Sequence, residues 1–209
     1  MANVIGTGLV EKHDGEEVGY TIVHGLDSAL ALKADTEWLA FNLQVMTELQ
    51  NIAKSKEELI ALLTAHQFED SHWSWLRKSV VSTGPEYEWF YYLAENQVQG
   101  ICNIYHPKPS KIDAMDIFYV KYVAIAPWNR PNCLSPKKFG GIGTILIKVA
   151  LTHAIDVLGY RPGFSLHSLP QAEGYYLKIG MKDFGPDAAE QNLHFFEMER
   201  ETSERFAYA

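Results

Sequence analysis

The sequence predicts a mixed α/β fold, in which a mostly antiparallel central sheet is flanked by helices and contains one parallel strand pair. Three observations support this prediction. Runs of strand-forming residues occur near the N-terminus and again in the middle of the chain. Between them, residues 35–66 have apolar positions at helical spacing. From residue 112 to residue 168 a strand, a helix and another strand follow one another, and such a crossover makes its two strands parallel.

The chain is expected to begin with a β-hairpin and to continue with helices. Residues 4–10 and 18–24 are the hairpin strands, and the turn lies at Asp14-Gly15. The first helix is expected over residues 35–54, with Asp35 or Thr36 as its N-cap.

Two shorter helices are expected next. One covers residues 55–66, and the side chains of Ser55 and Glu58 form a capping box that satisfies free backbone donors at its start. The other covers residues 70–81, although Trp75 interrupts its apolar pattern.

The second half of the chain is expected to form most of the sheet. Three strands make a meander over residues 89–95, 97–106 and 112–125. After them come a helix closed by Gly159, a strand, a helix that starts at Pro170, and a last strand. These four elements are expected over residues 141–158, 164–168, 171–179 and 193–198. The charged tail after residue 198 is either helical or frayed.

Composition favours one domain and excludes several functions. The chain has 209 residues, 47% of them hydrophobic, which is enough for one substantial core. The net charge of −8 disfavours nucleic acid as a partner and favours a cationic substrate. No segment has the pattern of a signal peptide or a membrane span, so we expect no membrane partner. Cys102 and Cys133 suggest neither a disulfide nor a metal site, and a reducing cytoplasm suits the chain.

A glycine-rich turn at residues 138–143 is the most informative feature of the sequence. It lies between a strand-like run that ends at Pro127 and a helix-like run that begins at Thr144. Glycines let a ligand approach the backbone closely, and the unpaired N–H groups of a first helical turn attract anions. The turn therefore predicts a phosphate site.

Two known phosphate-binding patterns fit this turn poorly. A Walker loop needs Lys followed by Ser or Thr after its last glycine, whereas Gly143 is followed by Thr144-Ile145. A dinucleotide-binding loop has the pattern G-x-G-x-x-G in an N-terminal βαβ unit, and the turn at Gly141 lacks both the third glycine and that position.

The turn, with two further segments, resembles the GNAT (Gcn5-related) N-acetyltransferases. Lys138 stands where the R/Q-x-x-G-x-G/A loop of that family begins. Residues 171–181 are similar to the family's A-x-x-F-Y-x-k-x-G-F signature, and residues 123–130 to its L-x-V-x-P-x-x-R segment. The resemblance covers about residues 88–200, which would form the cofactor-binding core of a single domain spanning residues 1–209. Residues 1–87 would then supply the hairpin and the helices on the acceptor side.

The resemblance implies a GNAT-like fold and an acyltransferase activity. In that family the parallel strands splay apart, and the pantetheine arm of acetyl-CoA enters the gap. The chain is therefore expected to move an acetyl group from acetyl-CoA to a primary amine of a small molecule or protein, by direct attack in a ternary complex. No metal is needed. The resemblance assigns cofactor contacts mainly to backbone groups, of Val123, Ala124, Ile125, Lys138, Phe139, Gly140, Gly141, Ile142, Gly143 and Thr144.

Tyr176 aligns with the signature tyrosine and is the candidate general acid. A phenol beside the sulfur can protonate the thiolate that leaves when an amine attacks a thioester. Tyr175 takes the position that is usually Phe and is expected to pack.

The general base is harder to assign. Candidates on or beside the strand meander are Glu88, Glu95, His106 and Asp116. Tyr119 stands near the position where some relatives have a strand glutamate. His167 and Ser168 replace the Asn of many relatives, and they either contact the cofactor arm or the amine or belong to the core.

Two other features remain open. Residues 131–137 form an insertion relative to the compact family pattern, either a pocket or partner surface or an ordinary loop. The tryptophans and the pair Tyr91-Tyr92 either line an aromatic acceptor site or form core.

A noncatalytic acetyl-CoA sensor that acts on a protein partner is the alternative function, because it needs neither Tyr176 nor a base. Edge strands of such folds often pair between subunits, so a homodimer is possible.

Overall fold

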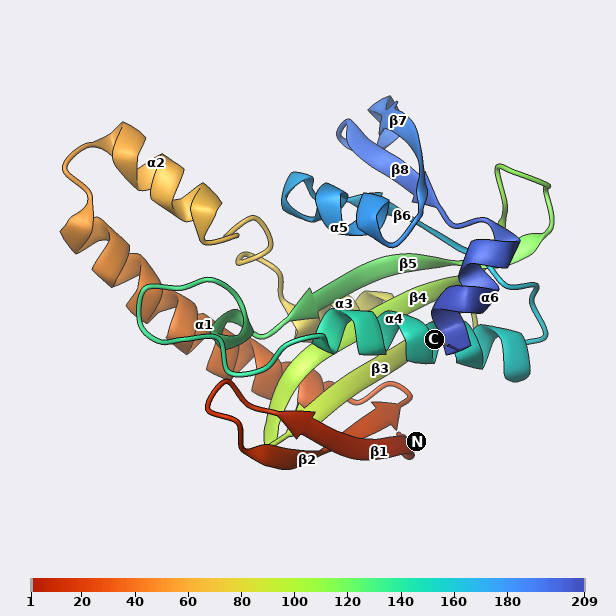
Figure 1. Cartoon of the computed structure of the whole chain (residues 1–209), viewed down its shortest axis with the longest axis horizontal. Coiled ribbons are helices and arrows are strands. Elements are labelled where there is room, and N and C mark those ends of the chain that lie inside the picture. The colour runs from red at the N-terminus through yellow and green to blue at the C-terminus, as the bar shows by residue number, and fades with distance from the viewer. Residues whose placement is uncertain (1, 209) are drawn as a thin grey trace. The chain divides into compact units, whose positions relative to one another are not determined.

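The fold class predicted from the sequence is confirmed. The computed structural model describes residues 2–208 and contains an eight-stranded sheet in the order β1-β2-β3-β4-β5-β6-β8-β7 (Figure 1). Strands β5 and β6 are parallel, whereas β1–β2, β2–β3, β6–β8 and β7–β8 pair antiparallel.

The strands are β1 (Asn3–Glu11), β2 (Glu17–His24), β3 (Tyr87–Ala94), β4 (Gln97–Pro109), β5 (Asp116–Ile125), β6 (Phe164–Ser168), β7 (Lys182–Asp187) and β8 (Leu193–Glu197). The helices are α1 (Ser28–Ile52), α2 (Lys56–Ala65), α3 (Trp75–Val81), α4 (Ile142–Asp156), α5 (Glu173–Lys178) and α6 (Arg200–Tyr208). Short 3-10 turns are η1 (Pro127–Asn129), η2 (Pro170–Ala172) and η3 (Ala188–Glu190). Within the described residues, no helix combines the length and apolar character that crossing a membrane requires.

Contacts divide the chain into two compact units. Unit 1 comprises the described residues up to Thr83 together with Phe90–Ile101 and Ala124–Gly143. Unit 2 comprises Gly84–Trp89, Cys102–Val123 and the described residues from Thr144 onwards. The prediction of a single domain over residues 1–209 stays a prediction.

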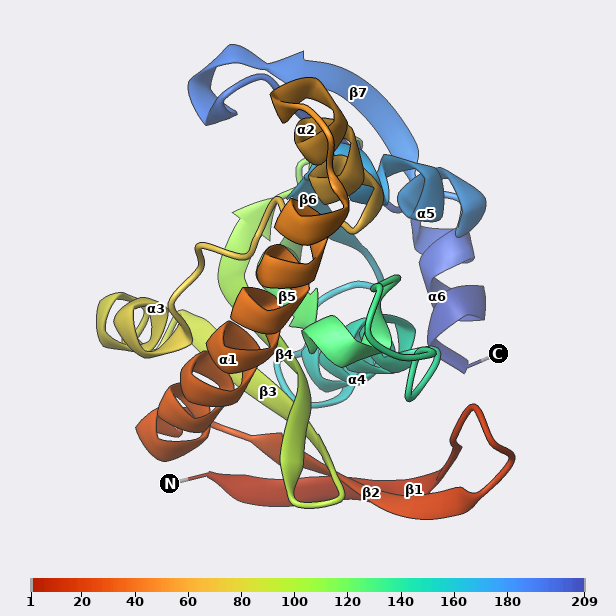
Figure 2. The same ribbon diagram turned by 90° about the vertical axis from the view of Figure 1, so that its left-hand side faces the viewer.

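In unit 1 the predicted hairpin and helices are present, but α1 begins earlier than expected. Strands β1 and β2 pair around the turn, and α1 contacts α2 and α3 (Figure 2). The cap of α1 is Asp27, whose carboxylate accepts from the backbone N–H groups of Ala29 and Leu30 at 2.9 and 3.0 Å. The prediction of Asp35 or Thr36 as N-cap was wrong, because the Ala- and Leu-rich segment before them also favours helix.

Asp35 instead fixes the start of α3. Its carboxylate accepts from the backbone N–H of Trp75 at 2.6 Å and from that of Leu76 at 3.0 Å. The third helix therefore begins at Trp75, with Ser74 as its N-cap, and not at Asp70 as predicted. Trp75 does not interrupt the helix; it starts it and is buried.

In unit 2 strand β7 was not predicted from the sequence, and strand β5 is shorter than predicted. Strand β5 begins at Asp116 rather than at residue 112, because residues 110–115 form a turn. The Ser110 hydroxyl accepts from the backbone N–H of Ile112 at 3.0 Å, and the buried carboxylate of Glu197 accepts from that of Lys111 at 2.8 Å. Strand β7 was not expected, because its residues are polar and mostly exposed and include Gly185 and Pro186.

The remaining predictions for unit 2 hold with small changes. Strand β6 has the predicted bounds, and Gly159 follows α4 with a φ of 73°. The tyrosine helix is shorter than predicted, because Pro170–Ala172 forms the turn η2 before α5. The C-terminal tail is helical as α6.

Candidate active site

The glycine loop of unit 1 presents its backbone at the surface before α4. Gly140 and Gly141 are exposed, and Gly141 has a φ of 73°, a conformation that favours glycine. No described atom lies within 4 Å of a Cβ built on either residue. A Cβ on Gly143 would contact the Ile125 side chain at 3.8 Å. The backbone N–H groups before Ile142, the first residue of α4, are therefore open to an anion.

A buried amide network holds the loop in place. The Gln99 side-chain oxygen accepts from Trp128 Nε1 at 2.7 Å and from Asn129 Nδ2 at 2.9 Å. Asn129 Oδ1 in turn accepts from the backbone N–H of Phe139 at 3.1 Å. Gln99 and Asn129 are 0% and 2% exposed, so these bonds are shielded from water. The network thus fixes the backbone just before the glycines.

Lys138 is already engaged by acidic and amide groups of unit 1. Its ammonium group pairs with the Glu95 carboxylate and donates to Gln97 Oε1 at 3.2 Å. This pairing is the main reason that the pKa of Glu95 lies below its ordinary value. An anion at the loop would therefore bind to backbone N–H groups. The Lys138 ammonium group could contact that anion only after the Lys138 side chain has left Glu95.

A basic cavity of about 360 Å³ adjoins Lys138. Its lining includes Lys12 from the end of the hairpin, Trp128, and Ser135, Pro136 and Lys137 of the insertion. The insertion of residues 131–137 therefore does more than close a surface loop, because it forms one wall of this cavity.

In unit 2 the parallel strands β5 and β6 stop pairing before either strand ends. Their register covers Phe118–Phe164, Tyr119–Ser165 and Val120–Leu166. Strand β5 continues to Ile125 and β6 to Ser168, so the described register between the two strands ends at Val120–Leu166, before either strand does. Such a gap can accept an extended ligand that pairs like an added strand.

Tyr176 lies in the interior of unit 2 on α5. It is 5% exposed, and its ring lies 5.8 Å from that of Phe196 and 5.3 Å from that of Tyr175. Burial raises the pKa of the Tyr176 phenol, so it keeps its proton at neutral pH and can donate it. Tyr175 is not only packing, because its hydroxyl lies 2.9 Å from Thr144 Oγ1 in the first turn of α4.

His167 is held between two side chains that the sequence did not connect to it. Its Nδ1 lies 2.8 Å from the Tyr119 hydroxyl, and its Nε2 lies 3.3 Å from Asp187 Oδ2. Ser168 is buried, and its hydroxyl donates to the Leu169 carbonyl at 2.8 Å. Tyr119 and Asp187 come from β5 and the end of β7.

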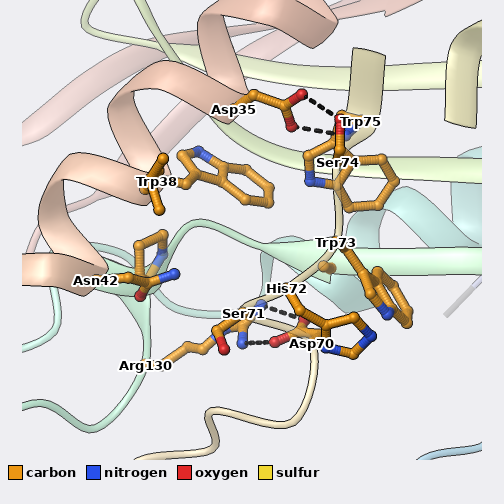
Figure 3. Close-up of a pocket in the computed structure, with 13 residues that line it drawn as sticks. Asp35, Trp38, Asn42, Asp70, Ser71, His72, Trp73, Ser74, Trp75 and Arg130 are labelled. Carbon is orange, nitrogen blue, oxygen red and sulfur yellow. Dashed lines mark hydrogen bonds and ion pairs between the residues drawn. The ribbon is translucent and has the colours of Figure 1, made fainter. Parts of the chain in front are cut away.

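A second cavity, of about 300 Å³, lies within unit 1 (Figure 3). It includes Ala124, one of the residues to which the resemblance assigns contacts with the cofactor arm. The rest of the lining comes from α1, from residues 70–75 and from the chain after β5: Asp35, Trp38, Leu39, Asn42, Asp70, Ser71, His72, Trp73, Ser74, Trp75, Pro127 and Arg130.

Arg130 ties three segments of this cavity together. Its guanidinium group pairs with the Asp70 carboxylate, as the dashed lines in Figure 3 show. It also donates to the Ile125 carbonyl from Nε at 3.0 Å and from Nη2 at 2.7 Å. The backbone carbonyl at the end of β5 is thereby fixed, which positions the segment that includes Val123 and Ala124.

The aromatic residues named from the sequence divide into two groups. Trp89, Tyr91 and Tyr92 are core, with at most 1% exposure. Trp38, Trp73 and Trp75 line the cavity of Figure 3, and of these Trp38 and Trp75 are buried.

Comparisons with known proteins give structural neighbours but no close relative. No protein-family model and no curated protein matches the sequence. The solved structures to which it is similar include GNAT acetyltransferases, all at low identity. A putative GNAT acetyltransferase from Desulfovibrio desulfuricans is 11% identical, with a TM-score of 0.47, and the match covers 86% of this chain and 98% of that one.

Two further neighbours were solved with a coenzyme. The PaiA N-acetyltransferase of Thermoplasma acidophilum, in complex with coenzyme A, is 12% identical, with a TM-score of 0.44, over 85% of this chain and 98% of that one. The Campylobacter jejuni N-acetyltransferase PseH, in complex with acetyl coenzyme A, is 11% identical, with a TM-score of 0.41, over 60% and 77%. The predicted roles of the individual site residues in this chain stay predictions.

Proposed function

We propose that the chain is an N-acetyltransferase that moves an acetyl group from acetyl-CoA to a primary amine in a ternary complex. The glycine loop is the observation that carries this proposal. It offers exposed backbone N–H groups before α4, and the buried Gln99 network holds it in place. A pyrophosphate is the ligand that such a site suits, because several N–H donors can share its charge.

The cavity of Figure 3 supports an amine as the acceptor. Two carboxylates, of Asp35 and Asp70, and one guanidinium group, of Arg130, line it, which leaves one negative charge without a cationic side chain in the lining. An ammonium group is attracted to such a site. The cavity also reaches Ala124, next to the backbone that the resemblance assigns to the thioester arm.

In the proposed reaction the amine nitrogen attacks the acetyl carbonyl carbon, and the carbon–sulfur bond then breaks. A backbone N–H near Ile125 would stabilise the negative oxygen of the tetrahedral intermediate. Tyr176 would donate its proton to the leaving sulfur, because its phenol stays protonated at neutral pH. The acceptor is a small-molecule or protein amine.

Calorimetric titration with acetyl-CoA, followed by thiol release against a panel of amines, tests the proposal. We expect micromolar binding together with thiol release that depends on the amine. A Trp73→Ala variant should raise the KM for the amine while acetyl-CoA still binds normally. If the protein does not bind acetyl-CoA at all, the proposal is wrong.

A noncatalytic acetyl-CoA sensor is the second candidate, and the burial of Tyr176 favours it. A phenol that is 5% exposed reaches a substrate only if the gap beside α5 admits one. The same experiment separates the two functions, because a sensor binds acetyl-CoA but releases no thiol with any amine. A sensor would also bind free CoA and acetyl-CoA with different affinities, since it must distinguish them.

A further inference from the structure

The basic cavity beside Lys138 belongs to unit 1 and has more positive than negative charge in its lining. Its volume of about 360 Å³ is within the range of small-molecule sites. The described lining residues include the ammonium groups of Lys12, Lys137 and Lys138 but only one carboxylate, that of Asp14. Three positive charges less one negative charge leave two positive charges on these side chains. The cavity is therefore suited to a ligand with two negative charges.

One carboxylate beside the cavity holds two of these lysines close together. Glu95, in the turn between β3 and β4, pairs with Lys138 and lies 3.4 Å from Lys12 Nζ. Lys12 also pairs with Glu16. An ammonium group has three N–H donors, so each lysine can keep these partners and still donate one hydrogen bond to a ligand. The side chains of Lys12 and Lys138 are 18% and 30% exposed, so solvent reaches both cations only in part.

Lys137 is the third cation and has no competing partner. It is exposed, and within residues 2–208 its side chain makes no hydrogen bond or ion pair. Its ammonium group can therefore bind a ligand without losing an existing bond. The hydroxyl group of Ser135 adds a neutral donor from the same wall of the cavity.

Hydrogen bonds fix the two segments that form the cavity. On the hairpin side, the backbone N–H of His13 donates to the Lys138 carbonyl at 3.1 Å. On the insertion side, Asn132 Oδ1 accepts from the backbone N–H groups of Leu134 and Ser135 at 3.0 and 2.9 Å. The end of the hairpin and the insertion are thus ordered segments, and their lysines line one cavity.

We propose that this cavity is a second anion site, separate from the glycine loop, and that it binds a phosphate monoester. Such a group carries nearly two negative charges at neutral pH, which matches the excess positive charge of the lining. Its three terminal oxygens accept hydrogen bonds from several directions, and lysine ammonium groups bind them as point charges. A carboxylate or a phosphodiester carries one charge and would neutralise only half of the excess.

Two sources can supply this phosphate monoester. Coenzyme A carries one on its ribose in addition to its pyrophosphate, and Lys138 both lines the cavity and begins the glycine loop. With that source the inference rests on the proposed function, and the end of the hairpin and the insertion determine the affinity for the acetyl donor. A separate phosphorylated molecule is the other source, and it would bind whether or not the chain binds acetyl-CoA.

Calorimetric titration with acetyl-CoA and with acetyl-dephospho-CoA, which lacks only the monoester, tests the first source. Lys137→Gln and Lys12→Gln are compared with Lys56→Gln, which removes the same charge from an exposed residue at the start of α2, outside the described lining. The unchanged protein and Lys56→Gln should bind acetyl-CoA about tenfold more tightly than acetyl-dephospho-CoA. Both cavity variants should lose most of this preference, while their affinity for acetyl-dephospho-CoA stays within about twofold.

Phosphorus NMR with inorganic phosphate as the probe tests the cavity without any coenzyme. Phosphate should bind to the unchanged protein and to Lys56→Gln, and several-fold more weakly to Lys137→Gln and Lys12→Gln. Acetyl-CoA should displace this phosphate, and acetyl-dephospho-CoA should not, if the monoester of the coenzyme occupies the cavity. Phosphate that stays bound with saturating acetyl-CoA, and that the cavity variants weaken, would support a separate phosphorylated ligand.

The failures of the two proposals can be told apart. Equal affinities for the two coenzymes, together with no phosphate binding that the cavity variants weaken, would overturn the second anion site and leave the transferase standing. If the protein binds neither coenzyme, the proposed function fails, and the phosphate titration alone decides whether the cavity is an anion site. Lys137→Gln is the decisive variant in both arms, because its side chain has no bond within residues 2–208 whose loss would disturb the fold.

Discussion

The glycine loop and the tyrosine helix α5 differ in the groups that they would bring to the proposed function, main-chain N–H groups in the loop and one side chain on α5. The loop offers main-chain N–H groups, and its side chains are mostly absent or turned to other partners, as Lys138 is to Glu95. Helix α5 offers one buried phenol, and its backbone serves only to place Tyr176. A substitution in the loop should therefore change affinity, whereas one on α5 should change rate.

The largest expected effect is that of Gly141→Glu. The new side chain must adopt a φ of 73° and brings a negative charge to the proposed pyrophosphate site. Strain and charge repulsion together should weaken acetyl-CoA binding by about a thousandfold, equivalent to about 4 kcal/mol. Calorimetric titration measures the change directly.

Gly140→Ala is the matched control for this prediction. Gly140 is also exposed, has no described atom within 4 Å of a built Cβ, and does not have a positive φ. Binding by this variant should stay within a few-fold of the original. If Gly141→Glu binds acetyl-CoA normally, the loop is not the phosphate site.

The next effect concerns α5. Tyr176→Phe removes the proposed proton donor and should lower kcat by about a hundredfold, while acetyl-CoA binding stays nearly the same. Tyr175→Phe is the neighbouring control, because it removes only the hydroxyl contact with Thr144. Steady-state thiol release and calorimetry on both variants separate rate from affinity. Equal kcat values for Tyr176→Phe and the original protein would remove Tyr176 from the mechanism.

A smaller effect is expected from the support beneath the loop. Gln99→Met keeps the side-chain length but leaves Trp128 Nε1 without its acceptor, and leaves Asn129 Nδ2 only the long bond of 3.4 Å to the Gln99 backbone carbonyl. The unpaired buried indole N–H and the weakened amide bond should reduce the free energy of unfolding by about 2 kcal/mol. The looser loop should also bind acetyl-CoA more weakly, with kcat unchanged.

Gln97→Met is the control variant for Gln99→Met. Both are measured by chemical denaturation and by calorimetric titration with acetyl-CoA. Gln97 is on the same strand and half-buried, and its side chain accepts from Lys138. This change should cost little stability, because the Lys138 ammonium group keeps its Glu95 partner. If both variants are equally stable, the network does not hold the loop.

The contrast also explains which parts of the site the sequence could predict. The loop depends on consecutive residues, so its glycines, its strand and its helix were all visible in the order of residues 122–150. The hydrogen bonds of His167 to Tyr119 and Asp187 join β5, β6 and the end of β7, and β7 itself has no strand-like pattern. Without that strand, nothing in the sequence connects Asp187 with His167.

The secondary structure shows the same difference between features set by neighbouring residues and features set by distant ones. Elements set by local signals, such as the hairpin, the Ser55 cap of α2 and strand β6, were predicted closely. The starts of α1, α3 and β5 were wrong because distant or unexpected polar groups decide them. Asp35 is a clear case, since it resembles a local N-cap but binds backbone groups 40 residues away.

The smallest expected effect is a change of stability with pH, which comes from His106 and His194 of unit 2 and not from the backbone groups of the glycine loop. Burial lowers the pKa of His106 below its ordinary 6.5, so the unfolded chain takes up a proton that the folded chain refuses. Stability should therefore fall as the pH drops below about 6.5.

His194 should change stability in the opposite direction, because its hydrogen bond to Asp183 raises its pKa. Its stabilising contribution is present at low pH and is lost as the pH rises above 6.5. Thermal unfolding of His106→Gln and His194→Gln from pH 5 to pH 8 should show the first variant gaining, and the second losing, relative to the original protein as the pH falls. Parallel curves for both variants would mean that neither histidine changes its pKa on folding.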